Sequence, residues 1–381
     1  MIPYGKHTLL EQDIDAVVDV LKNQFLTQGS QVPLFEQELC RYTGAQSAVA
    51  VNSGTSGLHI ACLAAGVTPG DTVWTVPISF AASANCARYC GASVDFVDIE
   101  PHTRNLNVSA LVDKLHLAAA EHTLPKVIVV VHFTGSSNDM AAIAAITEPF
   151  NITLIEDAAH ALGASDPQGY KVGACKYSAM TVLSFHPVKS ITSAEGGAVL
   201  TNDDELAALL RRYASHGITR EPGMLGDEHA NEPWFYAQFE LGYNYRLSDL
   251  HAALGRSQLA HIDEFIARRR TLAENYHQAL ADLPLILPQP DANGAWHLYM
   301  VELTAHDRTE VFNALRARGI GVNVHYIPIH WHPYYQQLGF KRGQFPQSEA
   351  YYNRALTLPL YPGLSADNQN EVIQQLKEVL V

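Results

Sequence analysis

The pattern of apolar and polar positions along the chain predicts short strands that alternate with helices. Apolar residues recur at helical spacing within 12–23, where Ile14, Val17 and Leu21 share one face. Short continuous apolar runs are typical instead of strands that are buried on both faces of a sheet. Such runs are predicted as strands at residues 48–52, 71–77, 93–98, 126–131, 152–157, 179–183 and 198–201.

Helical segments separate most of these strands, which favours an α/β fold with a mostly parallel sheet and covering helices. The predicted helices lie at residues 12–23, 32–42, 58–65, 109–121, 140–146 and 203–216. In sheets of this kind, ligands bind beyond the carboxyl ends of the strands. The residues that fall at those ends, and that we therefore expect near a site, are Asn52, Phe80, His132, Asp157 and Ser184.

The pattern changes after residue 216. Segment 217–242 mixes Gly, Pro, acids and aromatics and is predicted to be a long loop. Ser248 then caps a helix that we expect to run to about residue 280, with the arginines of 268–270 on a solvated face.

A shift in composition at 283–294 marks the entry to a second domain. Its predicted elements are a strand at 297–303, a helix at 309–318, an extended segment at 325–329 and a closing helix that runs to 381. We expect a large domain over residues 1–250. Residues 251–381 would form the long linking helix and a smaller C-terminal α+β domain.

Composition narrows the class of protein. The 381 residues are 47% hydrophobic and 17% charged, which is an ordinary globular balance, and the formal net charge is −14 with no basic run. No apolar run reaches membrane-spanning length and the first residues form no signal peptide. Five cysteines form no CxxC pair. We expect a cytoplasmic protein that binds neither nucleic acid nor a membrane.

Metal binding has little support in the sequence. His325, His330 and His332 lie close together, but their HxxxxHxH spacing matches no zinc site. We expect no metal centre.

Lys189 is an unusual residue for its position. It follows a buried strand and a turn at Pro187, in an irregular segment that ends at Gly196 and Gly197. A loop lysine can simply be solvated, since burying an unpaired ammonium costs several kcal/mol. In a dry pocket, however, its pKa falls, and it becomes a nucleophile towards carbonyls and a Schiff-base anchor for pyridoxal phosphate.

A second feature predicts a phosphate site. Segment 53–57, Ser-Gly-Thr-Ser-Gly, joins a strand to a helix, so Gly54 and Thr55 offer free backbone N–H groups at a helix N-terminus. An ordinary N-cap would produce the same pattern.

Together these residues supply what pyridoxal phosphate needs from a protein. Lys189 would anchor the cofactor, and Asp157 would face the pyridinium nitrogen. Gly54, Thr55 and Ser184 would cradle the phosphate and Phe80 would stack on the ring. The four roles occur at successive strand ends, which makes a pyridoxal phosphate enzyme the favoured reading.

Several motifs resemble those of the DegT family of nucleotide-sugar aminotransferases, in the family's order and essentially from end to end. They are Asn52-Ser-Gly-Thr-Ser, Glu156-Asp-Ala-Ala-His160, Ser184-Phe-His-Pro-Val-Lys189, Glu195-Gly-Gly and Gly242-Tyr-Asn-Tyr-Arg246. The resemblance implies the fold-type I aminotransferase architecture, a mostly parallel sheet of the seven-stranded type, and a homodimer with shared active sites.

The resemblance also implies roles for single residues. Lys189 carries the cofactor, Asp157 pairs with the pyridine nitrogen and Ser184 contacts the phosphate. His160 lies near the phenolic oxygen of the ring, and Asn244 reaches the phosphate of the partner subunit's site. By the same resemblance, the residues that bind the substrate would also include Gly54, Ser184 and Asn244.

One branch of the family, the transaminases of pseudaminic acid biosynthesis, is the most similar. It implies L-glutamate as donor and a UDP-linked 4-keto-6-deoxy-N-acetylhexosamine as acceptor, with a UDP-4-amino sugar and 2-oxoglutarate as products. The positions that match the sugar-nucleotide site of that branch are Tyr4, Thr27, His325 and Tyr326. Loop 221–239 is longer and more acidic than this branch leads us to expect.

Other functions stay open. A transaminase for a bacillosamine- or perosamine-type ketosugar, or one linked to dTDP, would carry the same cofactor residues. A dehydratase of this fold has histidine in place of Lys189, and a nicotinamide-linked dehydrogenase would show a GxGxxG motif, which is absent after any predicted strand. A non-catalytic regulator that binds pyridoxal phosphate is a more distant alternative.

Overall fold

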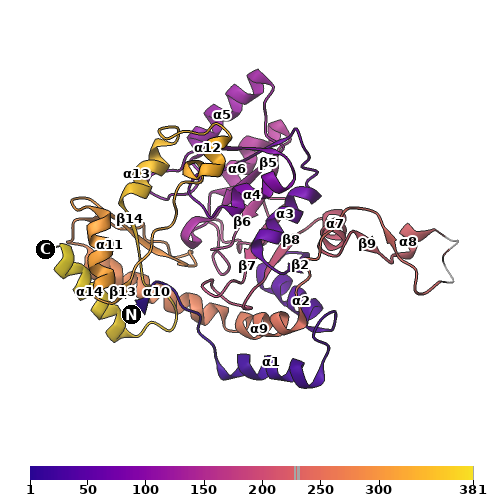
Figure 1. Ribbon diagram of the computed structural model, residues 1–381, viewed down its shortest axis with the longest axis horizontal. Helices are drawn as coiled ribbons and strands as arrows, with labels where there is room; N and C mark the ends of the chain where they lie inside the picture. The colour runs from indigo at the N-terminus through magenta and orange to yellow at the C-terminus, as the bar shows by residue number, and fades with distance from the viewer. Residues whose placement is uncertain (227–228, 230–231, 381) are drawn as a thin grey trace.

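The main sheet of this computed structural model has the predicted α/β character. The structure describes residues 1–226, 229 and 232–380. Within them the main sheet has seven strands in the order β2-β8-β7-β6-β5-β3-β4, and every pairing is parallel except the two made by β8 (Figure 1). The strands are β2 (Ser47–Val51), β3 (Thr72–Thr75), β4 (Ser93–Phe96), β5 (Val127–Val131), β6 (Thr153–Asp157), β7 (Met180–Ser184) and β8 (Gly197–Thr201).

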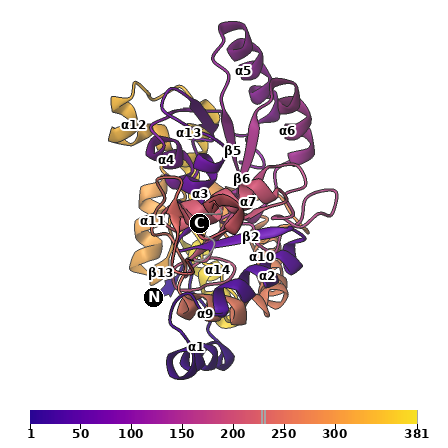
Figure 2. The same cartoon turned by 90° about the vertical axis from the view of Figure 1, so that its right-hand side faces the viewer.

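Helices cover both faces of this sheet because successive side chains of each strand point to opposite sides. Val49 and Val51 pack in one core with α3, α4 and α7, whereas Ala48 and Ala50 pack on the other face with α2. The N-terminal helix α1 lies at the edge of the molecule against α9 (Figures 1 and 2). The bounds are α1 (Glu11–Asn23), α2 (Gln31–Thr43), α3 (Gly54–Ala64), α4 (Ala82–Tyr89), α5 (Val108–Glu121), α6 (Met140–Thr147) and α7 (Asp204–Ala214).

The C-terminal part has its own antiparallel sheet, in which β12 (Tyr299–Leu303) lies between β11 (Leu285–Ile286) and β14 (Ala355–Leu358). Its helices are α11 (Arg308–Ala317), α12 (Pro333–Gln337), α13 (Pro346–Arg354) and α14 (Ala366–Leu380). The start of the chain joins this part, because β1 (Ile2–Pro3) pairs in parallel with β13 (Ile320–Gly321). The first residues of the chain are thereby held beside residues far along it.

The long helix expected after Ser248 is in fact two helices, so that prediction was wrong. α9 (Asp249–Leu259) packs on α1 and α2, and α10 (Ile262–Leu280) begins after a break at residues 260–261. The first half of α10 joins the core of the large sheet, and its second half joins the core of the C-terminal sheet. Neither Gly nor Pro marks the break, and tertiary packing decides it. The proposed division at residue 250 therefore falls in the first turn of α9, within a pair of helices that contacts both parts.

The expectation for residues 268–270 was also wrong. Arg269 is only 1% exposed, and its Nη1 donates to the carbonyls of Trp296, His297 and Leu360. Backbone oxygens replace water around this guanidinium, and helical periodicity gives no sign of them.

Segment 217–242 is more ordered than the predicted loop. β9 (Ile218–Thr219) pairs antiparallel with β10 (Ala237–Gln238), and the short α8 (Pro222–Leu225) follows β9. This arm extends away from the body of the molecule (Figure 1). Of the acidic loop 221–239, residues 227–228 and 230–231 lie outside the described part. No helix in the described part of the chain has both the length and the apolar character needed to cross a membrane.

Candidate active site

A cavity of about 370 Å³ opens where β6 and β7 end and α3 begins. It brings together residues that sequence reasoning placed at a site, from both ends and the middle of the chain. Those residues are Tyr4, Gly54, Thr55, Phe80, Asp157, His160, Ser184, Lys189, His325 and Tyr326. The position is the one expected for a ligand in a sheet of this kind.

The first wall of the cavity is the N-terminus of α3. Ser53 caps this helix, and its Oγ accepts from the Ser56 N–H at 3.1 Å. The N–H groups of Gly54 and Thr55 have no hydrogen-bond partner among the described residues. A Cβ on Gly54 would lie 3.0 Å from the Ser184 Cβ. The bare backbone therefore leaves room for an anion at the positive end of the helix dipole.

Lys189 lies on the opposite side, in the irregular segment after β7. Its backbone N–H donates to the His186 carbonyl at 2.9 Å, which fixes the turn that carries it. The side chain as a whole is only partly buried. Even so, the loss of water around the amine lowers the pKa of Lys189 to about 8, and the charge of Asp157 offsets part of this shift. An amine of this kind is neutral often enough at physiological pH to act as a base.

Asp157 ends β6 and points into the same cavity. Its Oδ2 accepts from Ser83 Oγ at 2.6 Å, and Ser83 in turn shares a 2.6 Å hydrogen bond with Ser79. Its Oδ1 accepts from the Ala159 N–H at 3.2 Å. The carboxylate is thus held in one orientation by residues that follow β3 and β6, two strands separated by β5.

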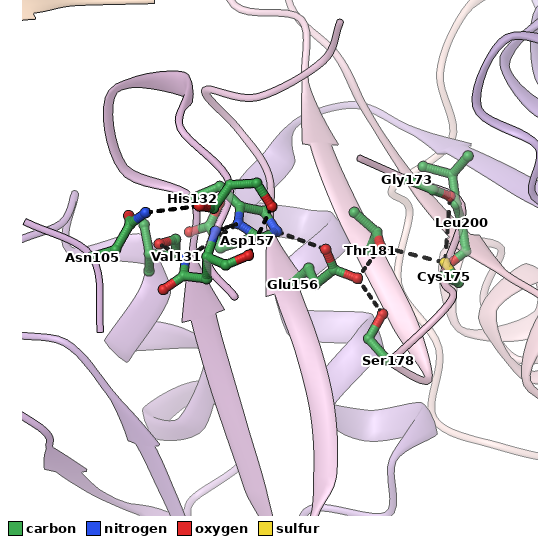
Figure 3. Close-up of polar contacts among 12 residues, drawn as sticks. Asn105, Val131, His132, Glu156, Asp157, Gly173, Cys175, Ser178, Thr181 and Leu200 are labelled. Carbon is green, nitrogen blue, oxygen red and sulfur yellow. Dashed lines mark hydrogen bonds and ion pairs between the residues drawn. The ribbon is translucent and has the colours of Figure 1, made fainter. Parts of the chain in front are cut away.

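The adjacent acid, Glu156, points to the other face of the sheet and serves structure (Figure 3). It accepts hydrogen bonds from His132 Nε2 at 2.6 Å and from the hydroxyls of Ser178 and Thr181. Burial by itself would raise the pKa of Glu156, but these three bonds outweigh it and hold the pKa below its ordinary value. Both ring nitrogens of His132 are hydrogen-bonded, to Glu156 and to the Asn138 N–H. His132 does not line the cavity, although it was expected near the site.

His160 lies deeper, next to Tyr326. The Tyr326 hydroxyl and His160 Nε2 are 3.3 Å apart, and the two rings stack at 6.1 Å. Burial lowers the pKa of His160 well below its ordinary value, and the charge of Lys189 adds to the effect. His160 Nδ1 is buried and has no partner among the described residues. An orphaned polar atom of this kind is suited to contact a polar group of a bound ligand.

Tyr4 and His325 come from the two ends of the chain. Their rings lie 5.1 Å apart, and His325 Nδ1 shares a 2.8 Å hydrogen bond with Thr357. Burial lowers the pKa of His325 to about 3, with a contribution from the charge of Lys189. This ring is therefore uncharged at neutral pH. The pairing of β1 with β13 is what brings these two residues together.

Three expected residues lie differently from the rest. Phe80 lines the cavity but is 61% exposed, which leaves much of its ring uncovered within one chain. Thr27 and Asn244 do not line the cavity of their own chain. Asn244 lies in a β-bridge with Ser215.

Sequence reasoning missed Ser79 and Ser83, which support Asp157, and His297, whose ring lies 4.3 Å from that of His160. The serines follow a predicted strand, so their position was a usable signal. His297 had none, since it reaches the site through the packing of the C-terminal part.

A lysine and an acid line one cavity at the strand ends of this sheet, beside the N-terminus of a helix, and this is the arrangement of a fold-type I pyridoxal phosphate enzyme. The sequence profile of the DegT/DnrJ/EryC1/StrS aminotransferase family matches residues 7–377, and the chain belongs to this family. The cradle, the orphaned His160 Nδ1 and the Lys189–Asp157 pair fit the cofactor. The chain is a pyridoxal-phosphate-dependent sugar aminotransferase.

Individual relatives agree with this assignment. The spore coat polysaccharide biosynthesis protein SpsC of Bacillus subtilis is 37% identical over 388 residues, which cover 100% of this chain and 97% of SpsC. PseC of Helicobacter pylori, an aminotransferase involved in the biosynthesis of pseudoaminic acid, superposes with a TM-score of 0.90 at 29% identity, over 100% of this chain and 99% of PseC. Spr1654 of Streptococcus pneumoniae in its PLP form superposes with a TM-score of 0.88 at 26% identity, over 99% of this chain and 98% of Spr1654. The predicted fold, enzyme class and cofactor are confirmed.

Proposed function

We propose that this protein transfers the amino group of L-glutamate to the 4-keto carbon of a UDP-linked 4-keto-6-deoxy-N-acetylhexosamine. The products would be a UDP-4-amino sugar and 2-oxoglutarate, in the pathway to pseudaminic acid. The observation that carries the proposal is one cavity lined by Lys189, Asp157 and the residues Tyr4, His325 and Tyr326. The similarity to PseC supports this choice of sugar.

The proposed roles follow from the geometry. Pyridoxal phosphate, when bound, supplies an electron sink for the carbon that loses a proton. Lys189 would hold the cofactor, and the N–H groups of Gly54 and Thr55 with the Ser184 hydroxyl would bind its phosphate. Asp157, fixed by Ser83, would keep the pyridine nitrogen protonated. Phe80 would pack on the ring.

Lys189 would also move the protons. With a pKa of about 8, its amine can take a proton from the donor's α-carbon and return one at the acceptor's C4. His160 would donate towards the phenolic oxygen of the cofactor, and Tyr4, His325 and Tyr326 would contact the sugar nucleotide.

A second subunit completes the proposed site. Thr27 and Asn244 lie outside the cavity of their own chain, and the exposed ring of Phe80 has room for a covering segment. In a cytoplasmic homodimer, Asn244 would contact the phosphate held by the partner subunit, and Thr27 would contribute to the sugar-nucleotide site.

An alternative acceptor deserves a separate test. The 37% identity to a spore coat polysaccharide protein exceeds the 29% identity to PseC. A transaminase for another nucleotide-linked 4-ketosugar, of bacillosamine or perosamine type, with the same cofactor chemistry, is therefore kept as the alternative.

The role of Lys189 is tested with the purified holoenzyme. Borohydride should fix the cofactor covalently to Lys189, as peptide mass spectrometry would report. Lys189→Ala should lose at least about 10³-fold in kcat, because both the anchor and the proton carrier are removed. Full turnover by this variant would contradict the proposed roles of Lys189 as anchor and proton carrier.

The acceptor is tested with a panel of UDP- and dTDP-linked 4-ketosugars and L-glutamate. We expect the highest kcat/KM for the UDP-linked 6-deoxy-N-acetyl compound, with NMR giving the stereochemistry at C4 of the product. A preference for a dTDP-linked sugar, or for one that lacks the N-acetyl group, would contradict the proposed acceptor and leave the enzyme class intact.

A further inference from the structure

His297 forms the wall behind His160, outside the cavity itself. The two ring centroids are 4.3 Å apart with an angle of 40° between the planes, and both residues are buried. His297 precedes β12, so it belongs to the C-terminal part, whereas His160 follows β6 of the main sheet. The contact is therefore a point at which the two parts of the chain meet directly behind the site.

The backbone around this contact is strained on both sides. Thr134, in the turn Phe133–Gly135 after β5, has φ 59°, and Trp296 has φ 49°. A β-branched or bulky residue rarely adopts this left-handed conformation, and such residues cluster at functional sites. The His297 N–H donates to the Thr134 carbonyl at 2.8 Å, which ties the two strained residues together.

Gly135 shows how closely this turn approaches His160. A Cβ at Gly135 would lie 2.8 Å from the His160 carbonyl oxygen and 3.1 Å from the His297 nitrogen. The Gly135 carbonyl accepts from the Ala295 N–H at 2.8 Å. The turn after β5 thus locks the backbones of His160 and His297 into one arrangement.

Arg269 of α10 supports His297 from behind. Its Nη1 donates to the carbonyls of Trp296, His297 and Leu360 at 3.0–3.4 Å. Among the described residues, no carboxylate lies within ion-pair distance of this buried guanidinium. A cation kept inside the protein on backbone oxygens alone is costly, which implies a use for its charge or its position.

The charged and titratable groups around His297 all oppose its protonation. They are His160, Lys189, Arg269 and His325. Burial lowers the pKa of His297 well below its ordinary value, and these neighbours lower it further. His297 is therefore a neutral ring at physiological pH.

The hydrogen bond between Tyr326 and His160 occupies Nε2 of His160 and leaves Nδ1 as the nitrogen without a partner among the described residues. Burial raises the pKa of the Tyr326 hydroxyl, so it keeps its proton. His160 Nε2 lies 3.3 Å from that hydroxyl, and the tautomer in which Nε2 accepts from it is the one that leaves a donor at Nδ1. A neutral imidazole that accepts at Nε2 carries its hydrogen at Nδ1, and this N–H is the one without a protein partner.

We propose that His297 is a positioning residue, which holds the ring of His160 so that its Nδ1 faces the cofactor, and that Arg269 keeps the backbone of His297 in place. This inference rests on the proposed role of His160 at the cofactor. A protonated or displaced His297 would push His160 away from that orientation. The C-terminal part would in this way control the geometry of a group in the large sheet.

The test compares two substitutions at His297 in the pyridoxal-phosphate-loaded enzyme. His297→Phe keeps an aromatic ring against His160, so we expect kcat of the glutamate half-reaction to stay within about threefold of wild type. His297→Ala removes the ring, and we expect kcat to fall at least about tenfold with KM for glutamate changed less than about twofold. If His297 had only a structural role, His297→Ala would lower the yield of folded protein, but the folded fraction would keep the wild-type kcat.

Imidazole NMR gives a readout besides activity. The His160 signal, assigned with His160→Asn, should stay constant from pH 8 to 5.5 in wild type and His297→Phe, but should titrate in His297→Ala as water enters. Arg269→Met should make the His160 signal titrate as it does in His297→Ala, because the carbonyls of Trp296, His297 and Leu360 lose their donor, and Arg269→Lys should restore the constant signal. The comparison of His297→Phe with His297→Ala tests the positioning role of His297 even if Arg269→Met does not fold.

Three results would overturn the inference. They are wild-type kcat in His297→Ala, a constant His160 signal in that variant, and a constant His160 signal in folded Arg269→Met. Failure of the proposed role of His160 looks different. In that case His160→Asn would keep the wild-type rate of the half-reaction, while the His160 signal would still respond to His297→Ala.

Discussion

Glu156 and Asp157 are neighbours in the chain and end on opposite faces of β6, with different tasks. Asp157 points into the cavity, where Ser83 and the Ala159 N–H orient its carboxylate. On the other face, the Glu156 carboxylate accepts hydrogen bonds from His132, Ser178 and Thr181. Successive side chains of a strand point to opposite faces of the sheet. Asp157 therefore faces the cavity, while its neighbour Glu156 forms structural hydrogen bonds on the other face.

A matched pair of substitutions should separate these tasks. Asp157→Asn should lose at least about 10²-fold in kcat with little change in thermal stability, since the amide cannot balance a protonated pyridine nitrogen. Glu156→Gln should lower the free energy of unfolding by about 1–3 kcal/mol, because its amide N–H₂ would face donors. Calorimetry and glutamate half-reaction kinetics on both variants check this. Equal kinetic losses in the two would argue against the assignment.

At the scale of elements, the site depends on the close approach of α3 to the strands beneath it. β8 pairs with both β2 and β7, and its first residue, Gly197, lies directly under the turn into α3. A Cβ on Gly197 would be 2.6 Å from the Gly54 nitrogen and 2.8 Å from the Leu183 carbonyl oxygen. These are backbone atoms, which cannot move aside cheaply.

Gly197→Ala should therefore displace the cradle. We expect cofactor affinity to fall at least about tenfold and stability to fall by about 1–3 kcal/mol, the usual cost of overpacking. Gly223→Ala is the control, since a Cβ there meets nothing within 4 Å. Equilibrium titration with pyridoxal phosphate measures the first quantity and thermal unfolding the second. Unchanged affinity in Gly197→Ala would show that the cradle tolerates the shift.

At the scale of the whole molecule, a buried ion pair joins the two parts of the chain. Glu302 of β12 binds Arg104, which follows β4, at 2.6 Å, and it also binds Arg354 at 2.8 Å. The Arg104 and Glu302 side chains are almost fully buried, whereas that of Arg354 is 46% exposed.

Glu302→Gln should destabilise the protein by about 3–5 kcal/mol, because Arg104 would be left buried without a countercharge. Arg354→Ala should cost no more than about 1 kcal/mol, since an exposed pair is screened by water. Denaturant unfolding of both variants compares the two free energies. A similar loss in each would mean that burial does not set the strength of this link.

The buried histidines make the folded chain sensitive to acid. The pKa values of His160, His297 and His325 lie below the ordinary value, so each ring is uncharged when folded and takes up a proton near pH 6.5 when unfolded. Their contribution to stability is complete above pH 6.5. It is lost as the pH falls towards the folded-state pKa values, at up to about 1.4 kcal/mol per pH unit for each histidine.

The melting temperature should accordingly fall from pH 7 to pH 5, and the slope should be shallower in His297→Phe, which has one such ring fewer. Differential scanning calorimetry across this range measures both slopes. A melting temperature that does not change with pH in wild type would contradict the assignment of neutral rings.

Local sequence determined the strands, the parallel arrangement of most of them, and the cavity-lining residues that follow them, because a buried strand, a Gly-rich turn and a strand-end acid each leave a pattern within a few residues. Lys189, Asp157, Gly54 and Ser184 could be found in this way. Only the tertiary structure decided the break between α9 and α10, the burial of Arg269 and the contact of His297 with His160. Each of these depends on groups far away in the chain, whose carbonyls, rings and charges become neighbours only once the two parts have packed together.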